Sequence, residues 1–219
     1  MKYRVKKINN LFRPDASWDM DPWKDIPALS ITHYMGSRPD HFPLTEAKLI
    51  FDGKALFVMF RVQDRYVRAV AQNHQDNVFE DSCVEFFFTP GTDISKGYFN
   101  LEMNCGGVLL FHFQTKRGKD RIVISKNECR KISCVHSLPC IVNPEIQSPV
   151  TWTVSYQIPV SLLENYTQGI WPGPGVQWRA NFYKCGDKTS HPHWLTWALA
   201  DLPEPDFHRP EFFGMLEFE

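Results

Sequence analysis

The chain has 219 residues, of which 43% are hydrophobic and 22% charged, and its formal net charge at pH 7 is −1. These values are ordinary for a globular protein, and the length fits one all-β domain over residues 1–219. A net charge so close to zero gives no reason to expect nucleic acid or an anionic membrane as a partner. No apolar run approaches the ~20 residues that a membrane span requires.

The first residues leave the compartment undecided. The segment MKYRVKKINN has the basic start of a secretory signal, but no apolar core follows it. We therefore expect either a cytoplasmic chain or a mature form from which a signal was removed. Nothing in the sequence indicates an oligomeric state.

Short apolar segments separated by turn residues predict strands along most of the chain. A hairpin is expected where Asp52-Gly53 separates residues 48–51 from 56–62. Further strands are expected at 67–71, 82–89, 98–104, 108–113, 121–125, 131–136, 152–158, 178–183, 193–199 and 213–218. Helix is expected only as one turn at 160–164. This pattern predicts an all-β fold with little helix, an antiparallel β-sandwich of the jelly-roll or immunoglobulin-like kind.

The segment VFEDSCVEFFF, residues 78–88, places a carboxylate inside an apolar strand. Val84, Phe86 and Phe88 share one face of that strand, and Glu85 lies on the other. A buried charge without a partner is costly, so Glu85 must have a structural or a functional role.

Two later strands carry polar residues at alternate positions. These are Asn100, Glu102 and Asn104 in the first strand, and Arg179, Asn181 and Tyr183 in the second. Amides, a guanidinium and a carboxylate can form paired hydrogen bonds with neighbouring sugar hydroxyls, while aromatic rings cover the apolar side of a sugar. The alternative is that both strands turn a polar face to solvent and bind nothing.

The order of several segments resembles the family 9 carbohydrate-binding modules, in the form found as single-domain proteins. These segments are an early tryptophan pair (Trp18 and Trp23), LFVMFRVQD, FEDSCVEFFFTP, YFNLEMNCGG, WTVSYQIP, RANFYKC and HRPEFFGMLEF. The resemblance implies a jelly-roll-like β-sandwich. It also implies non-catalytic binding of a saccharide, in polysaccharide utilisation or catabolism, with no cofactor required.

The resemblance also implies which residues hold the saccharide. Sugar-binding members clasp a terminal saccharide between two aromatics and hold its hydroxyls with a carboxylate, an Arg and Asn residues. The first aromatic falls at Phe79, where the family usually has Trp, and the carboxylate at Glu85. The family's Arg-x-Asn matches Glu102-x-Asn104, and its later Asn matches Asn181. Tyr183, Trp194 and Trp197 are candidates for the second aromatic. The expected ligand-binding set is Phe79, Glu85, Glu102, Asn104, Arg179, Asn181 and Trp194.

Two departures from the family pattern concern the ligand and leave the fold untouched. Replacing the family's Arg by Glu102 reverses a charge, and Phe79 offers a thinner stacking platform than Trp. A saccharide is therefore expected as the ligand, and the family's usual plant-polysaccharide chain ends are expected less than other saccharides. The family also carries structural calcium, for which Asp52, Asp64 and Asp81 are candidate ligands, although their spacing is not that of an EF-hand.

Two other functions remain open from the residues alone. Glu85 and Glu102 would serve as the carboxyl pair of a glycoside hydrolase if both face one cavity. A haem-binding electron-transfer sandwich would need axial ligands, for which Met103, Met59 and His112 are available. Whether the chain is an enzyme is therefore not decided, and non-catalytic binding is favoured.

The cysteines and histidines predict no metal centre by their spacing. There is no Cys-x-x-Cys pair, and Cys83 inside its apolar strand is interpreted as a small hydrophobic residue. The group Cys129, Cys134, His136 and Cys140 fits no common zinc motif.

Overall fold

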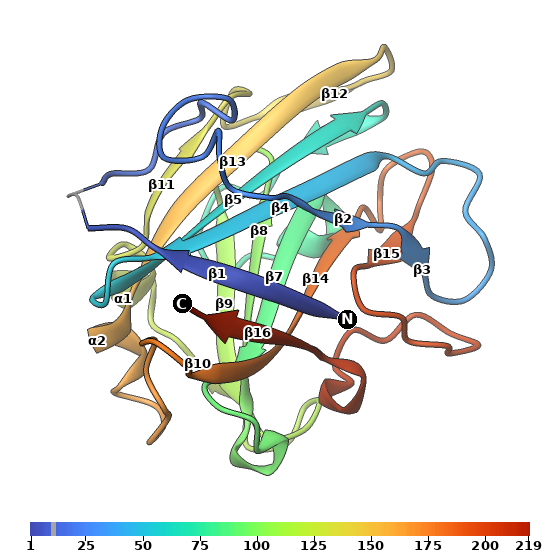
Figure 1. The fold of residues 1–219 in the computed structure, drawn as a ribbon. Coiled ribbons are helices and arrows are strands. Elements are labelled where there is room, and N and C mark those ends of the chain that lie inside the picture. Colours follow the sequence, from blue (N-terminus) through green and yellow to red (C-terminus); the bar gives the residue numbers. More distant parts are fainter. Residues whose placement is uncertain (10–11) are drawn as a thin grey trace.

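The structure is a computed structural model that describes residues 1–9 and 12–219 (Figure 1). Asn10, the last residue of the basic segment MKYRVKKINN, and Leu11 lie outside the described residues. The strands form two packed sheets that β1 joins at one edge. The predicted all-β sandwich is confirmed.

The first sheet contains six strands in an antiparallel arrangement. Their spatial order is β10 (Ile122–Val123), β9 (Leu109–Gln114), β8 (Tyr98–Asn104), β7 (Cys83–Thr89), β14 (Gln177–Cys185) and β16 (Gly214–Phe218). The short strand β15 (Trp194–Thr196) continues this sheet from β14, and β3 (His33–Tyr34) pairs with β15.

The second sheet crosses in front of the first in Figure 1. It contains β4 (Leu44–Phe51), β5 (Ala55–Asp64), β13 (Val150–Pro159) and β11 (Ser133–His136), with β2 (Leu29–Ile31) paired to β4. A separate two-stranded sheet pairs β6 (Val67–Ala69) with β12 (Val142–Ile146).

Helical segments are short, as expected. They are α1 (Lys126–Cys129), α2 (Val160–Leu163) and the 3₁₀ turns η1 (Val78–Glu80), η2 (Ile94–Lys96) and η3 (Pro210–Phe212). None of the helices in the described part of the chain has the length and apolar character needed to cross a lipid bilayer.

The main core lies between the two sheets. On β7 it receives Val84, Phe86 and Phe88, and on β8 it receives alternate residues such as Phe99 and Leu101. Each buried aromatic or aliphatic side chain contributes ~1.5–3 kcal/mol relative to exposure. Because side chains alternate along a strand, this same register turns the other residues of β7 and β8 toward the opposite face of the first sheet.

The hairpin predicted at Asp52-Gly53 joins β4 to β5. Asp52 Oδ1 accepts hydrogen bonds from the backbone N–H groups of Lys54 and Ala55, both at 2.8 Å. Gly53 has φ of +90°, which a side chain would disfavour. Asp52 therefore closes a tight turn.

Strand β1 (Lys2–Lys7) is not predicted by the sequence pattern. It runs parallel to β16 on one side and to β4 on the other, whereas the remaining pairings are antiparallel. Only Tyr3 and Val5 of this strand are buried, and the other four residues are Lys or Arg. Its charged sequence gives no sign of a strand, because its pairing requires the C-terminal strand β16 beside it. β2, β3 and β12 are also additional to the predicted strands.

The early tryptophans cover the outer face of the second sheet. Trp18 and Trp23 are buried there with Phe57 and Met59 of β5. Lys48 donates hydrogen bonds to the backbone carbonyls of both tryptophans, at 3.2 and 2.8 Å. The pair is thus structural.

Candidate functional site

A cavity of about 590 Å³ lies on the face of the first sheet that points away from the second sheet. Its floor consists of residues from β7, β8 and β9 at alternate positions: Glu85, Phe87, Asn100, Glu102, Leu110, His112 and Gln114. Its walls come from segments far apart in the sequence: Gln75 to Phe79, Arg117 to Val123, Cys185 to Trp194 and Pro205 to His208. The volume lies within the range of about 300–1,000 Å³ that is typical of small-molecule sites.

A chain of hydrogen bonds holds the amides of the floor in fixed orientations. The backbone N–H of Gly118 donates to Gln114 Oε1 at 3.0 Å, so Gln114 Nε2 is left as the donor. This nitrogen donates to His208 Nδ1 and to Asn100 Oδ1, both at 3.1 Å. Tyr98 also hydrogen-bonds His208 Nδ1, at 2.9 Å. His208 Nδ1 is therefore an acceptor and its imidazole is neutral, in agreement with burial, which lowers the pKa of His208 to about 4.

The chain ends on Glu102. Asn100 Nδ2 donates to Glu102 Oε1 at 3.0 Å, and this orientation of the amide follows from the hydrogen bond that Gln114 makes to Asn100. Glu102 Oε2 is buried and has no hydrogen-bond partner among the described residues. The network thus leaves one carboxyl oxygen of a cavity residue without a partner.

Burial favours the uncharged form of both floor carboxyls. Glu85 and Glu102 occupy directly paired positions of β7 and β8 and are 2% and 5% exposed. Burial raises the pKa of Glu102 to about 8, against the opposing hydrogen bond from Asn100. Burial, together with the neighbouring Cys185 and Glu102, raises the pKa of Glu85 well above its ordinary value. Two uncharged carboxyls therefore lie side by side in the floor.

Two aromatics form one wall and are joined through Asp187. Phe79 comes from η1 and Trp194 begins β15, and both are partly exposed. Trp194 Nε1 donates to Asp187 Oδ1 at 2.8 Å, and the backbone N–H of Asp187 donates to the carbonyl of Phe79 at 3.0 Å. Asp187 therefore positions both aromatic residues at the cavity.

Four of the seven expected ligand-binding residues line this cavity: Phe79, Glu85, Glu102 and Trp194. They come from four different elements, η1, β7, β8 and β15. The structure brings them together without any of them being adjacent in sequence.

Asn104, Arg179 and Asn181 do not line the cavity and bind other parts of the protein. Asn104 Oδ1 accepts from the backbone N–H groups of Gly106 and Val108 in the turn between β8 and β9. Arg179 Nη2 donates to the backbone carbonyls of Glu211 and Phe213.

Asn181 is buried under the segment that follows β15. Its Oδ1 accepts from the backbone N–H groups of Phe182 and Ala198, and its Nδ2 donates to Thr196 Oγ1 at 2.9 Å. Asn181 shares a face of β14 with Tyr183, but the segment after β15 covers Asn181 and separates it from the cavity.

The three candidates for the second aromatic have different surroundings. Trp194 lines the cavity. Tyr183 is buried behind it, stacked on Phe207 with ring centroids 4.1 Å apart. Trp197 packs in the main core against Phe182. Trp194 is the candidate that a cavity ligand can reach.

Asp52, Asp64 and Asp81 do not share a site. Asp52 closes its hairpin, and Asp81 Oδ2 accepts from the backbone of Val70 and Ala71. No potential metal cluster of the described residues includes any of the three. The structure gives no calcium site built from this set, and structural calcium stays a prediction.

Asp64 already has a cationic partner. Its Oδ2 lies 3.5 Å from the buried Lys184 ammonium, and its Oδ1 lies 2.7 Å from His41 Nε2. Burial alone would raise the pKa of Asp64, but Lys184, His41 and His193 lower it to about 2. A lysine ammonium thus neutralises this carboxylate.

The hydrolase alternative meets one of its two conditions. Glu85 and Glu102 do face one cavity, as a carboxyl pair must. A glycosidase also needs environments that keep one carboxyl protonated and the other ionised. Here burial raises the pKa of both. The surroundings of the pair therefore favour the uncharged form of both carboxyls.

The haem alternative is not supported by the positions of its candidate ligands. Met103 lies in the main core, Met59 on the outer face of the second sheet, and His112 in the cavity floor. The three residues lie on three different faces of the sheets, so no two of them could bind opposite sides of one haem iron.

Several cavity residues were not identified from the sequence. Asn100 lies on the predicted polar face of β8, and its alternation with Glu102 was the available signal. His112 was considered only as an axial ligand. Gln114, Asp187, Phe207 and His208 carry no such signal, because three of them lie outside strands and Gln114 follows an apolar run.

Comparison with known proteins places this chain in a family. Among solved structures, a protein of Bacteroides uniformis ATCC 8492, described as a proposed carbohydrate-binding protein, is 30% identical with a TM-score of 0.89. The match covers 100% of this chain and 99% of that chain. No match was found among curated protein sequences.

Two further solved structures show the same fold at lower identity. Both are family 9 carbohydrate-binding modules of Caldicellulosiruptor kristjanssonii, and the match covers 100% of this chain in each case. The complex with cellotriose has a TM-score of 0.66 at 12% identity, with 94% of that chain covered. The complex with glucose has a TM-score of 0.64 at 13% identity, with 96% of that chain covered.

The family assignment rests on the sequence as well. The family model described as Carbohydrate-binding family 9 matches residues 24–218, which include both sheets almost entirely. The predicted function, non-catalytic carbohydrate binding, is confirmed at the level of the family. The chain belongs to carbohydrate-binding family 9.

Proposed function

We propose that the cavity on the first sheet binds the end of a neutral saccharide. Phe79 and Trp194 would cover the apolar face of one sugar ring, and the floor would bind its hydroxyls through Glu102. Aromatic side chains beside a few fixed polar groups are the usual composition of a small-molecule site.

The observation that carries this proposal is the buried Glu102 Oε2 without a partner. A buried polar oxygen left unsatisfied costs ~1–3 kcal/mol, which a ligand hydroxyl at this position would offset. The protonated carboxyl can donate to a hydroxyl oxygen, so binding does not require an anion in the floor.

The class of saccharide follows from the floor of the cavity. Burial raises the pKa of both Glu85 and Glu102 and so favours their uncharged forms. Uncharged carboxyls offer hydrogen bonds to the hydroxyls of a neutral saccharide. The cellotriose and glucose complexes of family 9 modules from Caldicellulosiruptor kristjanssonii support a glucose-type ligand. Such a protein would serve polysaccharide utilisation or catabolism by holding the chain near its substrate.

Calorimetric titration with glucose and cellotriose, followed by a glycan array, tests the proposal. Phe79→Ala and Trp194→Ala should each weaken binding at least about tenfold, equivalent to ~1.4 kcal/mol. The matched control is Phe42→Ala, which removes an exposed phenylalanine outside the cavity. Folded protein that binds no saccharide, or binding that both cavity variants retain, would refute the proposed site.

A further inference from the structure

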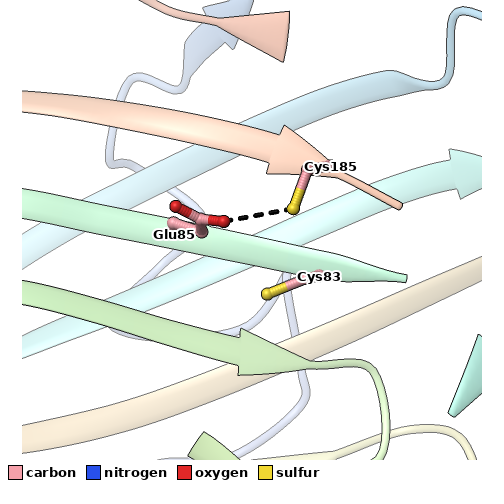
Figure 2. Close-up of side chains that lie close together, drawn as sticks. All are labelled: Cys83, Glu85 and Cys185. Atoms are coloured by element: carbon pink, nitrogen blue, oxygen red, sulfur yellow. Dashed lines mark hydrogen bonds between the residues drawn. The ribbon is translucent and has the colours of Figure 1, made fainter. Parts of the chain in front are cut away.

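Two thiols and a carboxyl meet at one corner of the cavity. Cys83 and Glu85 are two residues apart on β7 and so share a face, and Cys185 of β14 pairs directly with Cys83. The ligand atoms of the three residues lie within 4.8 Å of one another (Figure 2). The shortest of these contacts is the 3.1 Å hydrogen bond from Cys185 Sγ to a Glu85 carboxyl oxygen.

This donor set is one that zinc prefers. Zinc binds thiolate sulfur at about 2.3 Å and carboxylate oxygen at about 2.0–2.2 Å in a tetrahedral arrangement. Such an arrangement separates neighbouring donor atoms by roughly 3.5–3.8 Å. The donors of Cys83, Glu85 and Cys185 all lie within 4.8 Å of one another, so modest side-chain rotations would bring them to that spacing.

The other buried cysteines lack this arrangement. Cys105 and Cys129 are also buried, but neither belongs to a group of potential metal ligands among the described residues. Packing alone therefore accounts for the burial of Cys105 and Cys129. Cys83 and Cys185, in contrast, have a third potential ligand, Glu85, within reach.

The cluster also leaves room for a fourth ligand. Glu85 and Cys185 line the cavity, while Cys83 is fully buried behind them. A tetrahedral ion held by three protein ligands keeps its fourth position for water or a ligand. Here that position would face the cavity.

We propose that Cys83, Glu85 and Cys185 bind a zinc ion whose fourth coordination position faces the cavity. As the ion binds, the two thiol protons and the carboxyl proton leave to solvent. Burial raises the pKa of the Cys83 thiol to about 12 and opposes ionisation of all three groups without a metal. The positive charge of the ion offsets that cost. This site does not depend on saccharide binding.

The test is a titration of reduced, chelator-treated protein with Co²⁺, followed by displacement with Zn²⁺. We expect one Co²⁺ per chain, with sulfur-to-cobalt charge-transfer absorption and the visible bands of a tetrahedral ion, both lost when Zn²⁺ is added. Cys83→Ser and Cys185→Ser should abolish the charge-transfer band or reduce it markedly. Glu85→Gln should weaken metal affinity at least about tenfold, in line with the loss of one ligand. Cys105→Ser and Cys129→Ser are the matched controls and should bind Co²⁺ as the wild type does.

X-ray absorption on the zinc-loaded wild type needs no variant, so the proposal stays testable if a cysteine variant does not fold. Two sulfur ligands with oxygen in the remaining positions support the site. Absence of the charge-transfer band in folded wild-type protein, or its persistence in both cysteine variants, would overturn it. A Cys83–Cys185 disulfide in the freshly isolated protein would overturn it as well.

Discussion

Glu85 and Glu102 lie directly opposite each other on β7 and β8, and both carboxyls are buried in the floor of one cavity. Two ionised carboxylates in these positions would repel each other in a poorly solvated site. In the metal-free protein, burial favours their protonated forms, which makes the floor a hydrogen-bonding surface.

Stability should fall as the pH rises from about 4.5 to about 8. The pKa of Glu102 is about 8 in the folded protein and near 4.5 when unfolded, so above pH 4.5 the unfolded chain holds fewer protons than the folded one. The free energy of unfolding then decreases with pH until the folded carboxyl ionises, by at most ~1.4 kcal/mol per pH unit for each such group. Burial lowers the pKa of His193 to about 3 and that of His208 to about 4. These two histidines therefore change the pH dependence of stability only below about pH 6.5.

Urea denaturation from pH 7 to 8 measures this decrease. Glu102→Gln carries no ionisable group and should show a shallower decline than the wild type, with Glu85 accounting for the remainder. Equal slopes for the two proteins would mean that Glu102 is ionised in the folded state.

Replacing Asp187 should loosen the aromatic wall. Asp187→Ala removes the acceptor of the hydrogen bond from the Trp194 indole N–H, and such a hydrogen bond contributes ~1 kcal/mol. Because this bond positions the Trp194 ring, saccharide affinity should fall about fivefold. Asp187→Asn keeps an acceptor oxygen and should restore most of the affinity, measured by calorimetry at constant pH. Loss of affinity in the Asn variant as well would assign the effect to the charge of Asp187.

Asn181→Ala should reduce stability without changing affinity. The substitution leaves the backbone N–H groups of Phe182 and Ala198 without an acceptor, at a cost of about 2–4 kcal/mol. The exposed Asn127→Ala should stay within about 0.5 kcal/mol of the wild type. Denaturation gives the first quantity and saccharide titration of the folded variant gives the second. A saccharide affinity that falls with Asn181→Ala would place this residue in the binding site after all.

Lys184→Met should destabilise the protein strongly. The Lys184 ammonium is fully buried, lies 3.5 Å from Asp64 and hydrogen-bonds His193 at 2.7 Å. Removing it leaves the Asp64 carboxylate uncompensated, which costs about 3–5 kcal/mol.

The control for this substitution is Lys188→Met. Lys188 pairs with Glu80 at the surface, where its side chain is 60% exposed, and exposed pairs contribute only ~0–1 kcal/mol. Thermal unfolding of both variants should separate them clearly, and similar losses would show that the buried ion network is dispensable.

Local pattern was sufficient to predict most strands of both sheets. Alternation of apolar and polar residues assigned Val84, Phe86 and Phe88 to the core and Glu85 to the other face, as the structure has them. The same pattern gave no indication of β1, because its charged sequence pairs with strands at the far end of the chain. Parallel pairing between the two ends of a chain produces no pattern in the local sequence that would predict it.

The sequence by itself determined which residues share a face of each strand, since that depends only on a period of two. It could therefore place Glu85 and Glu102 on polar faces, but it grouped Asn104, Arg179 and Asn181 with them. Tertiary structure decided which part of those faces becomes a cavity. The turn after β8 engages Asn104, the segment after β15 covers Asn181, and loops far apart in the chain bring Phe79, Asp187 and His208 to the remaining floor. Those contacts depend on how segments far apart in the chain pack together. The alternation of residues within one strand carries no information about that packing.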